Sequence, residues 1–123
     1  MKFLSVIICM IFMHIVDDYY LQGWLASAKQ KTWWKDNAPD ELYRYDYIWA
    51  LIMHSFSWSF MIMIPLAVAH NFDIGPAYII FLIANTITHA LIDNAKANRH
   101  EINLWQDQIL HLTQIILTAV CIL

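Results

Sequence analysis

Residues 47–69 of this chain read YIWALIMHSFSWSFMIMIPLAVA, an apolar run that carries no formal charge. A helix needs about 20 such residues to cross the hydrocarbon core of a bilayer, so this run predicts a transmembrane helix. One further apolar stretch precedes it and two follow it. The pattern predicts helices over about 3–25, 47–69, 77–98 and 104–123.

The composition favours a membrane protein over a soluble domain. Of the 123 residues, 60% are hydrophobic and 14% are charged, whereas soluble domains carry about 25% charged residues. A chain of this length has too little interior to bury so much apolar surface. We therefore expect one domain over 1–123, an all-α integral membrane bundle of four transmembrane helices. The formal net charge of −3 argues against a nucleic-acid partner.

The connections predict the orientation of this bundle. The segment 29–46 is aromatic and charged, so we expect it to be an interfacial segment between helices 1 and 2. Lysine and arginine are concentrated in this segment and around the connection 97–103, whereas only Lys2 lies on the other side. By the positive-inside rule, both connections lie in the cytoplasm and both chain termini lie outside it.

Three pairs of histidine and aspartate lie within the apolar helices. The two members of each pair are four residues apart, so they share one face of a helix. Ionisable side chains inside membrane helices are costly and are usually functional. The pairs are His14/Asp18, His89/Asp93 and Asp107/His111.

Alternation of the helices brings these pairs to one depth. Helices 1 and 3 run in the same direction with histidine first, and helix 4 runs oppositely with aspartate first. The three aspartates then lie at a similar level near the cytoplasmic end, with the three histidines about one turn, roughly 6 Å, deeper. His54 lies near two turns into helix 2 from the same side. All four helices therefore contribute polar groups to one level.

Imidazole and carboxylate groups in this number predict a buried site for a divalent metal. They suit zinc first, with manganese or iron as alternatives, and several carboxylates would suit a two-metal site. Seven candidates exceed the ligands of one tetrahedral zinc, so either two ions bind or some aspartates only orient a ligating histidine. Any one of the histidines alone would be explained by a hydrogen bond within the bundle. The predicted ligands are His14, Asp18, His54, His89, Asp93, Asp107 and His111.

Polar residues beside this site suggest catalysis. Gln22 and Lys96 each lie about one turn beyond an aspartate of the set, and Lys29 follows in the first connection. These three are candidates to bind an anionic or carbonyl group of a substrate. Lys96 could instead neutralise Asp93 or extend toward the lipid headgroups. An aspartate that does not bind metal would act as general base. The catalytic candidates are Asp18, Asp93, Asp107 and Lys96.

Two further polar residues adjoin the candidates. Asp17 is expected to be an interfacial or capping group. Gln108 follows Asp107 directly, so on a helix it points about 100° away from it. We assign neither residue to the predicted site.

The order of the motifs resembles an uncharacterised family of small membrane proteins from bacteria and tailed phages, a domain of unknown function. The resemblance covers nearly the whole chain and implies the bacterial inner membrane as its location. At the level of the fold, the chain is also broadly similar to membrane-bound, metal-dependent hydrolases with transmembrane helices rich in His and Asp. The motifs are His14-x3-Asp18-x3-Gln22, isolated His54, His89-x3-Asp93-x2-Lys96 and Asp107-Gln108-x2-His111.

The leading functional hypothesis is a membrane-embedded, metal-dependent hydrolase. Its substrate would be of the lipid type, or carry a phosphate or ester, and would meet the site near the cytoplasmic headgroups. Membrane lipid and a second copy of the chain are the expected partners. Three alternatives remain at this point: a proton- or ion-coupled transporter or relay, a haem protein with two axial histidines, and a phage holin-like or exclusion protein.

Overall fold

The computed structural model describes residues 2–123, and all regular structure in this range is helical. This confirms the predicted all-α class. The elements in chain order are α1 (Lys2–Val16), the π-helix η1 (Asp17–Leu21) that continues it, α2 (Leu25–Ala28), α3 (Lys31–Asn37), the 3₁₀-helix η2 (Glu41–Tyr43), α4 (Asp46–Ala69), α5 (Pro76–Ala97) and α6 (Leu104–Ile122).

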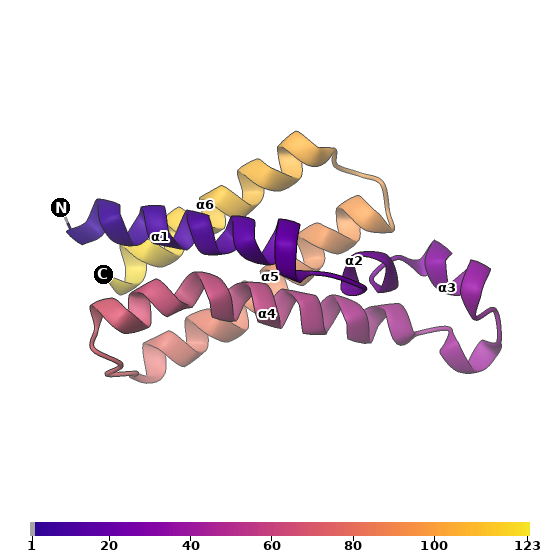
Figure 1. Cartoon of the computed structure of the whole chain (residues 1–123), viewed down its shortest axis with the longest axis horizontal. Helices are drawn as coiled ribbons and strands as arrows, with labels where there is room; N and C mark the ends of the chain where they lie inside the picture. The colour runs from indigo at the N-terminus through magenta and orange to yellow at the C-terminus, as the bar shows by residue number, and fades with distance from the viewer. Residues whose placement is uncertain (1) are drawn as a thin grey trace.

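The four long helices pack into one bundle (Figure 1). Helix α4 packs against both α1 and α5, and α6 packs against α5 and α1, with a smaller contact between α4 and α6. Both termini and the α4–α5 turn lie at one end of the bundle, whereas α2, α3 and the α5–α6 connection lie at the other (Figure 1). The second end, which we call the α3 end, carries the lysines and arginines of the two basic connections.

Three of the described helical segments are long and apolar enough to cross a membrane. They are Lys2–Leu21, Glu41–Ala69 and Pro76–Ala97. Helix α6 is not among the segments that are long and apolar enough. The fourth transmembrane helix therefore stays a prediction.

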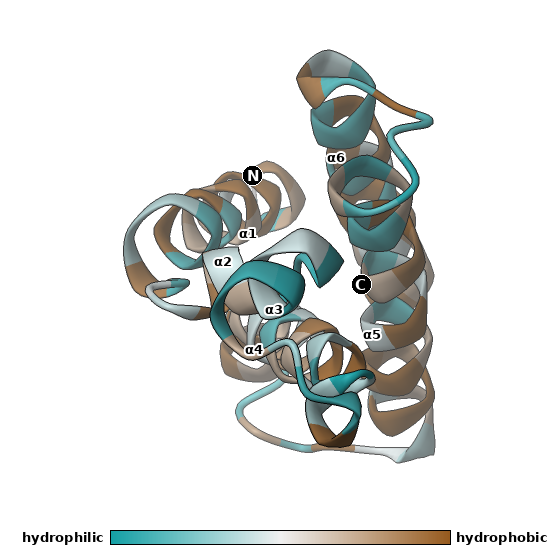
Figure 2. Ribbon diagram, turned by 90° about the vertical axis from the view of Figure 1, so that its right-hand side faces the viewer, coloured by the Kyte–Doolittle hydropathy of each residue, from teal (hydrophilic) through white to brown (hydrophobic). Residues whose placement is uncertain are grey.

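The bundle buries a narrow interior and exposes an apolar exterior. Trp58, Ile62 and Leu66 of α4 lie at successive turns and are fully buried, together with Met10 of α1 and Ile115 of α6. Large apolar side chains on the outer faces of all four long helices are exposed. Viewed from the α3 end, hydrophilic colour covers much of α3 and of the near turns of α6, and hydrophobic colour prevails along α5 (Figure 2). An exposed apolar surface of this extent is typical of a lipid-facing bundle.

Local sequence signals set the helix ends. Pro76 occupies the first turn of α5, where its fixed φ suits a helix start. The Asn103 side chain accepts a hydrogen bond from the Gln106 backbone N–H while the Gln106 side chain accepts one from Asn103, which forms a capping box for α6.

The first long helix is shorter than predicted. We expected it to run to residue 25, but it ends at Leu21 and α2 begins separately at Leu25. Gly23 adopts a φ of +53°, a left-handed conformation that glycine tolerates and that ends a helix. The segment 29–46 contains the short helices α3 and η2, and the Trp34 indole N–H donates to the Ala28 carbonyl oxygen at 2.7 Å.

Candidate metal centre

Side chains from three long helices meet inside the bundle near its α3 end. They are His54 of α4, His89 and Asp93 of α5, and His111 of α6, and all four are buried. Nε2 of His54 lies 3.2 Å from Nε2 of His89 and 3.2 Å from Oδ2 of Asp93. Oδ1 of Asp93 lies 3.6 Å from Nε2 of His89 and 3.4 Å from Nε2 of His111. We call these four residues the His/Asp centre.

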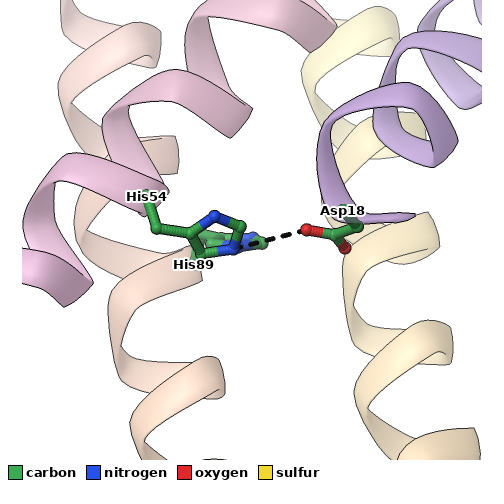
Figure 3. Close-up of side chains that lie close together, drawn as sticks. All are labelled: Asp18, His54 and His89. Atoms are coloured by element: carbon green, nitrogen blue, oxygen red, sulfur yellow. Dashed lines mark hydrogen bonds and ion pairs between the residues drawn. The ribbon is translucent and has the colours of Figure 1, made fainter. Parts of the chain in front are cut away.

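A carboxylate from the first helix faces this centre. Oδ1 of Asp18 lies 3.4 Å from Nε2 of His54. Figure 3 shows the Asp18 carboxylate directed across the interior toward the His54 and His89 rings. Asp107 borders the same space, because its Oδ1 lies 3.4 Å from Nε2 of His111.

These separations are compatible with ligands of one metal ion. Most of them exceed the range of about 2.7–3.2 Å that is usual for N–H···O hydrogen bonds. Ligand atoms placed about 2.0–2.2 Å from a tetrahedral metal lie about 3.3–3.6 Å from one another. The four distances given above for the His/Asp centre are between 3.2 and 3.6 Å, which is close to that range.

Several buried polar atoms at the centre have no hydrogen-bond partner among residues 2–123. They include both ring nitrogens of His111, Oδ1 of Asp18 and Oδ1 of Asp107. Buried polar atoms are normally paired, because leaving one unpaired costs about 1–3 kcal/mol. A cation bound among them would provide the missing partner.

Within the described chain, two overlapping groups of side chains could bind a metal ion. One consists of Asp18, His54 and His89, and the other of His89, Asp93 and His111. Five of the seven predicted ligands are thus brought together. His14 and Asp107 belong to neither group.

His14 forms hydrogen bonds at the edge of the centre. The Trp58 indole N–H donates to Nδ1 of His14 at 2.7 Å, so the proton of this ring is on Nε2. Nε2 of His14 then donates to Oε1 of Gln108 at 3.1 Å, and Nε2 of Gln108 donates to Oδ2 of Asp107 at 3.0 Å. This chain connects α4, α1 and α6. It leaves His14 without a free nitrogen for a metal.

The π-helix η1 turns two consecutive aspartates inward. Asp17 is buried, accepts a hydrogen bond from the Ser57 hydroxyl at 2.6 Å, and has its Oδ2 3.8 Å from Nδ1 of His54. Successive residues of an α-helix point about 100° apart, and the wider turn of a π-helix reduces this angle. Our expectation that Asp17 would be interfacial or capping was wrong. The signal that we underused was its position next to Asp18 in an apolar helix.

Two lysines form ion pairs with the aspartates. Nζ of Lys29 donates to Oδ2 of Asp93 at 2.6 Å, and Nζ of Lys96 donates to Oδ2 of Asp107 at 2.7 Å. The alternative that Lys96 neutralises Asp93 is therefore wrong. Lys96 pairs with Asp107, and Lys29 pairs with Asp93. The α5–α6 connection brings the first turn of α6 opposite the last turn of α5, so that Asp107 is within reach of Lys96.

A cavity of about 140 Å³ adjoins the centre on its α3 side. The predicted substrate-side residues Gln22, Lys29 and Lys96 all contribute to its wall. The remaining lining residues are Asp18, Tyr19, Asp93, Leu104 and Gln108.

Sequence reasoning missed two residues that support the histidines. The Trp58 ring stacks on His89 with centroids 4.2 Å apart, in addition to its hydrogen bond with His14. Trp58 follows His54 by four residues, so a shared helix face was the available signal. Gln108 contacts both His14 and Asp107 although it leaves the helix in a different direction from Asp107, because its side chain is long enough to turn back.

The chain belongs to the family described as "Protein of unknown function (DUF3307)", whose model matches residues 6–123. No curated protein and no solved structure matches the chain.

Proposed function

We propose that this member of the DUF3307 family is a membrane-embedded, metal-dependent hydrolase with its centre near the cytoplasmic face of the bacterial inner membrane. The observation that carries the proposal is that the Asp93 carboxylate lies 3.2–3.6 Å from imidazole nitrogens of three different histidines inside an apolar bundle. Ionisable groups are too costly to bury among membrane helices without a function.

The four long helices would cross the membrane with both termini outside. The α3 end, which carries the basic connections, would face the cytoplasm by the positive-inside rule. Helix α6 would be the fourth span, because Ile109, Leu117 and Val120 on its outer face are exposed. Its polar residues Asp107, His111 and Gln114 are buried in the bundle rather than directed at lipid.

One divalent ion would bind to the His/Asp centre. Nε2 of His89, Oδ1 of Asp93 and Nε2 of His111 would form the ligand set and leave a fourth position for water, with His54 beside them. The imidazole-rich composition favours zinc over manganese or iron. The two potential metal groups share His89, and one imidazole nitrogen binds one metal, which favours a single ion. Oδ2 of Asp93 remains paired with Lys29, which orients the carboxylate.

Hydrolysis would take place where the centre meets the cavity. A divalent metal supplies activation of a water molecule and polarises the scissile group. The water oxygen bonds to the phosphorus or carbonyl carbon, and the bond from that atom to the alcohol oxygen breaks. Asp18, which lines the cavity and faces His54, accepts a proton from the attacking water and returns it to the departing alcohol oxygen.

Buried polar groups continue inward from the centre. Asn85 donates to Thr118 at 3.0 Å, and Gln114 donates to Asn85 at 2.8 Å. On α6 the polar groups reach Thr118, beside which the apolar Leu66 and Ala119 are buried. A transporter that uses this line therefore remains the second candidate function, and the cavity beside the centre is the observation that favours the hydrolase.

The geometry also disfavours the haem and holin-like alternatives. A porphyrin must fit between its two axial imidazoles, and the Nε2 atoms of His54 and His89 are only 3.2 Å apart. A membrane-disrupting protein has no need of the hydrogen-bond chain through His14 and Gln108.

Hydrolysis by purified protein in detergent tests this proposal. Phosphate and carboxylate esters dispersed in micelles should be cleaved by the zinc-loaded chain, with loss of activity on chelation and recovery on addition of zinc. Asp18→Asn should slow the reaction about 100-fold or more while retaining the metal. Asp73→Asn, at an exposed aspartate of the α4–α5 turn, is the matched control and should be fully active. Activity indifferent to chelator and to Asp18→Asn would contradict the proposal.

A further inference from the structure

We propose that the substrate is a membrane amphiphile with a single phosphate monoester headgroup, which enters the cavity between α1 and α6 while its hydrocarbon chain stays in the bilayer. This inference rests on the proposed hydrolase function and specifies its substrate class. It is carried by the size of the cavity, the charge of its wall and the apolar side chains at its rim.

The size of the cavity limits what can enter. Its volume of about 140 Å³ is well below the roughly 300–1,000 Å³ of pockets that enclose a whole small molecule. It has room for a small headgroup, such as a phosphate, and not for a whole amphiphile. The remainder of any larger substrate must therefore lie outside the cavity.

The two lysines of the wall, which lie beside the carboxylates of Asp18 and Asp93, offer hydrogen-bond donors to an anion. Lys29 and Lys96 enter from different segments, and Nζ of each donates one hydrogen bond, to Asp93 and Asp107 respectively. A lysine ammonium has three donors, so each retains two for the oxygens of a phosphate without leaving its aspartate. The Lys29 side chain is only 13% exposed. A cation so shielded from water interacts strongly with an anion placed beside it.

The rim of the cavity is apolar. Tyr19 of η1 and Leu104 of α6 line it and are both exposed, at 57% and 55%. Their chain neighbours Tyr20 and Trp105 are exposed as well. Exposed tyrosine and tryptophan are typical of the level where hydrocarbon meets the headgroups. A group that extends from the cavity therefore meets apolar side chains at membrane depth.

The exposed lining residues Tyr19 and Leu104 belong to the two segments on either side of the cavity, η1 and α6. Its lining comes from η1 and the turn after it, from Lys29, from α5 and from α6, whereas α4 contributes none of the residues that line it. Helices α1 and α6 lie on opposite sides of the near end in the view from the α3 end (Figure 2). A substrate that approaches between Tyr19 and Leu104 places its headgroup against the lysines and the centre, with its chain directed toward lipid.

Matched substrates test the inference with the full chain in detergent micelles, loaded with zinc. Hexadecyl phosphate, butyl phosphate and the uncharged ester hexadecyl acetate separate the contribution of the anion from that of the chain. We expect release of inorganic phosphate from hexadecyl phosphate with a KM at least about tenfold lower than for butyl phosphate, since the long chain concentrates the substrate in the micelle that holds the protein. Hexadecyl acetate should be cleaved poorly.

Two variants test where the hydrocarbon chain and the phosphate group of the substrate bind. Leu104→Asn should raise the KM for hexadecyl phosphate and leave that for butyl phosphate unchanged, with exposed Leu117→Asn of α6 as the control. Lys96→Gln should raise the KM for both phosphates, with exposed Lys35→Gln of α3 as the control.

The outcomes separate this inference from the proposed function. Equal KM values for the two phosphates, or efficient cleavage of hexadecyl acetate, would overturn the substrate class and leave the hydrolase standing. Metal-loaded protein that cleaves none of the three would contradict the hydrolase and this inference together.

Discussion

The Nε2 atoms of His54 and His89 face each other at 3.2 Å in the middle of an apolar bundle. Each ring comes from a different helix, and in each ring Nδ1 has no hydrogen-bond partner within the described residues. Two neutral imidazoles at this distance share one hydrogen in an N–H···N bond, which fixes His54 against His89. The argument for a metal rests on the neighbouring group of His89, Asp93 and His111, whose separations exceed those of hydrogen bonds.

Asp17 should strengthen metal binding through His54. Its Oδ2 lies 3.8 Å from Nδ1 of that ring, and its Oδ1 is fixed by Ser57. A carboxylate that fixes a histidine beside the metal ligands supports the site, and loss of such an outer partner costs about 10- to 100-fold in metal affinity. Asp17→Asn should show this loss in a competition titration against a chelator. Asp40→Asn, at an exposed position, should bind metal as the wild type does. An unchanged affinity in Asp17→Asn would remove Asp17 from the site.

Trp58 should stabilise the fold in two ways, by packing on His89 and by its hydrogen bond to His14, and substitutions can separate the two. Trp58→Phe keeps an aromatic ring against His89 but leaves Nδ1 of His14 without its donor. An unpaired buried acceptor costs about 1–3 kcal/mol. Trp58→Ala removes the packing as well and should cost about 3–5 kcal/mol. Thermal unfolding in detergent, with exposed Trp49→Phe as the control, should give this order. Equal stability of wild type and Trp58→Phe would show that the hydrogen bond contributes nothing.

The orientation of the bundle predicts which connections react with reagents from each side. In a chain whose Cys9 and Cys121 are replaced by serine, Asp73→Cys should react in intact cells with a maleimide that cannot cross the inner membrane. Glu101→Cys, in the α5–α6 connection, should react only after the membrane is permeabilised. The reverse pattern would place the centre near the outer face.

The sequence was sufficient to predict the parts of the fold that depend on local pattern. The uncharged run 47–69 predicted the helix observed as α4, and i, i+4 spacing with alternating helix direction predicted that His89, Asp93 and His111 would meet. These inferences succeed because helical periodicity and an apolar solvent leave few arrangements for buried polar groups.

The parts that depend on contacts between helices could not be predicted. The π-helix that turns Asp17 inward has no sequence signature of its own. Lys29 pairs with Asp93, and Lys96 pairs with Asp107. Which lysine meets which aspartate depends on how the first connection and α6 lie against α5. The hydrogen bonds of His14 likewise depend on two other helices, so its spacing from Asp18 indicated a ligand where the structure shows a hydrogen-bonding role.

The most direct measurement is the metal content per chain of detergent-purified protein, by elemental analysis, for the wild type and two histidine variants. The account predicts one transition-metal ion in the wild type and none in His89→Ala. His70→Ala, at an exposed histidine after α4, should retain the ion. Protein that binds no metal after supplementation with zinc, manganese and iron, or that binds it equally well in His89→Ala, would contradict the proposed centre.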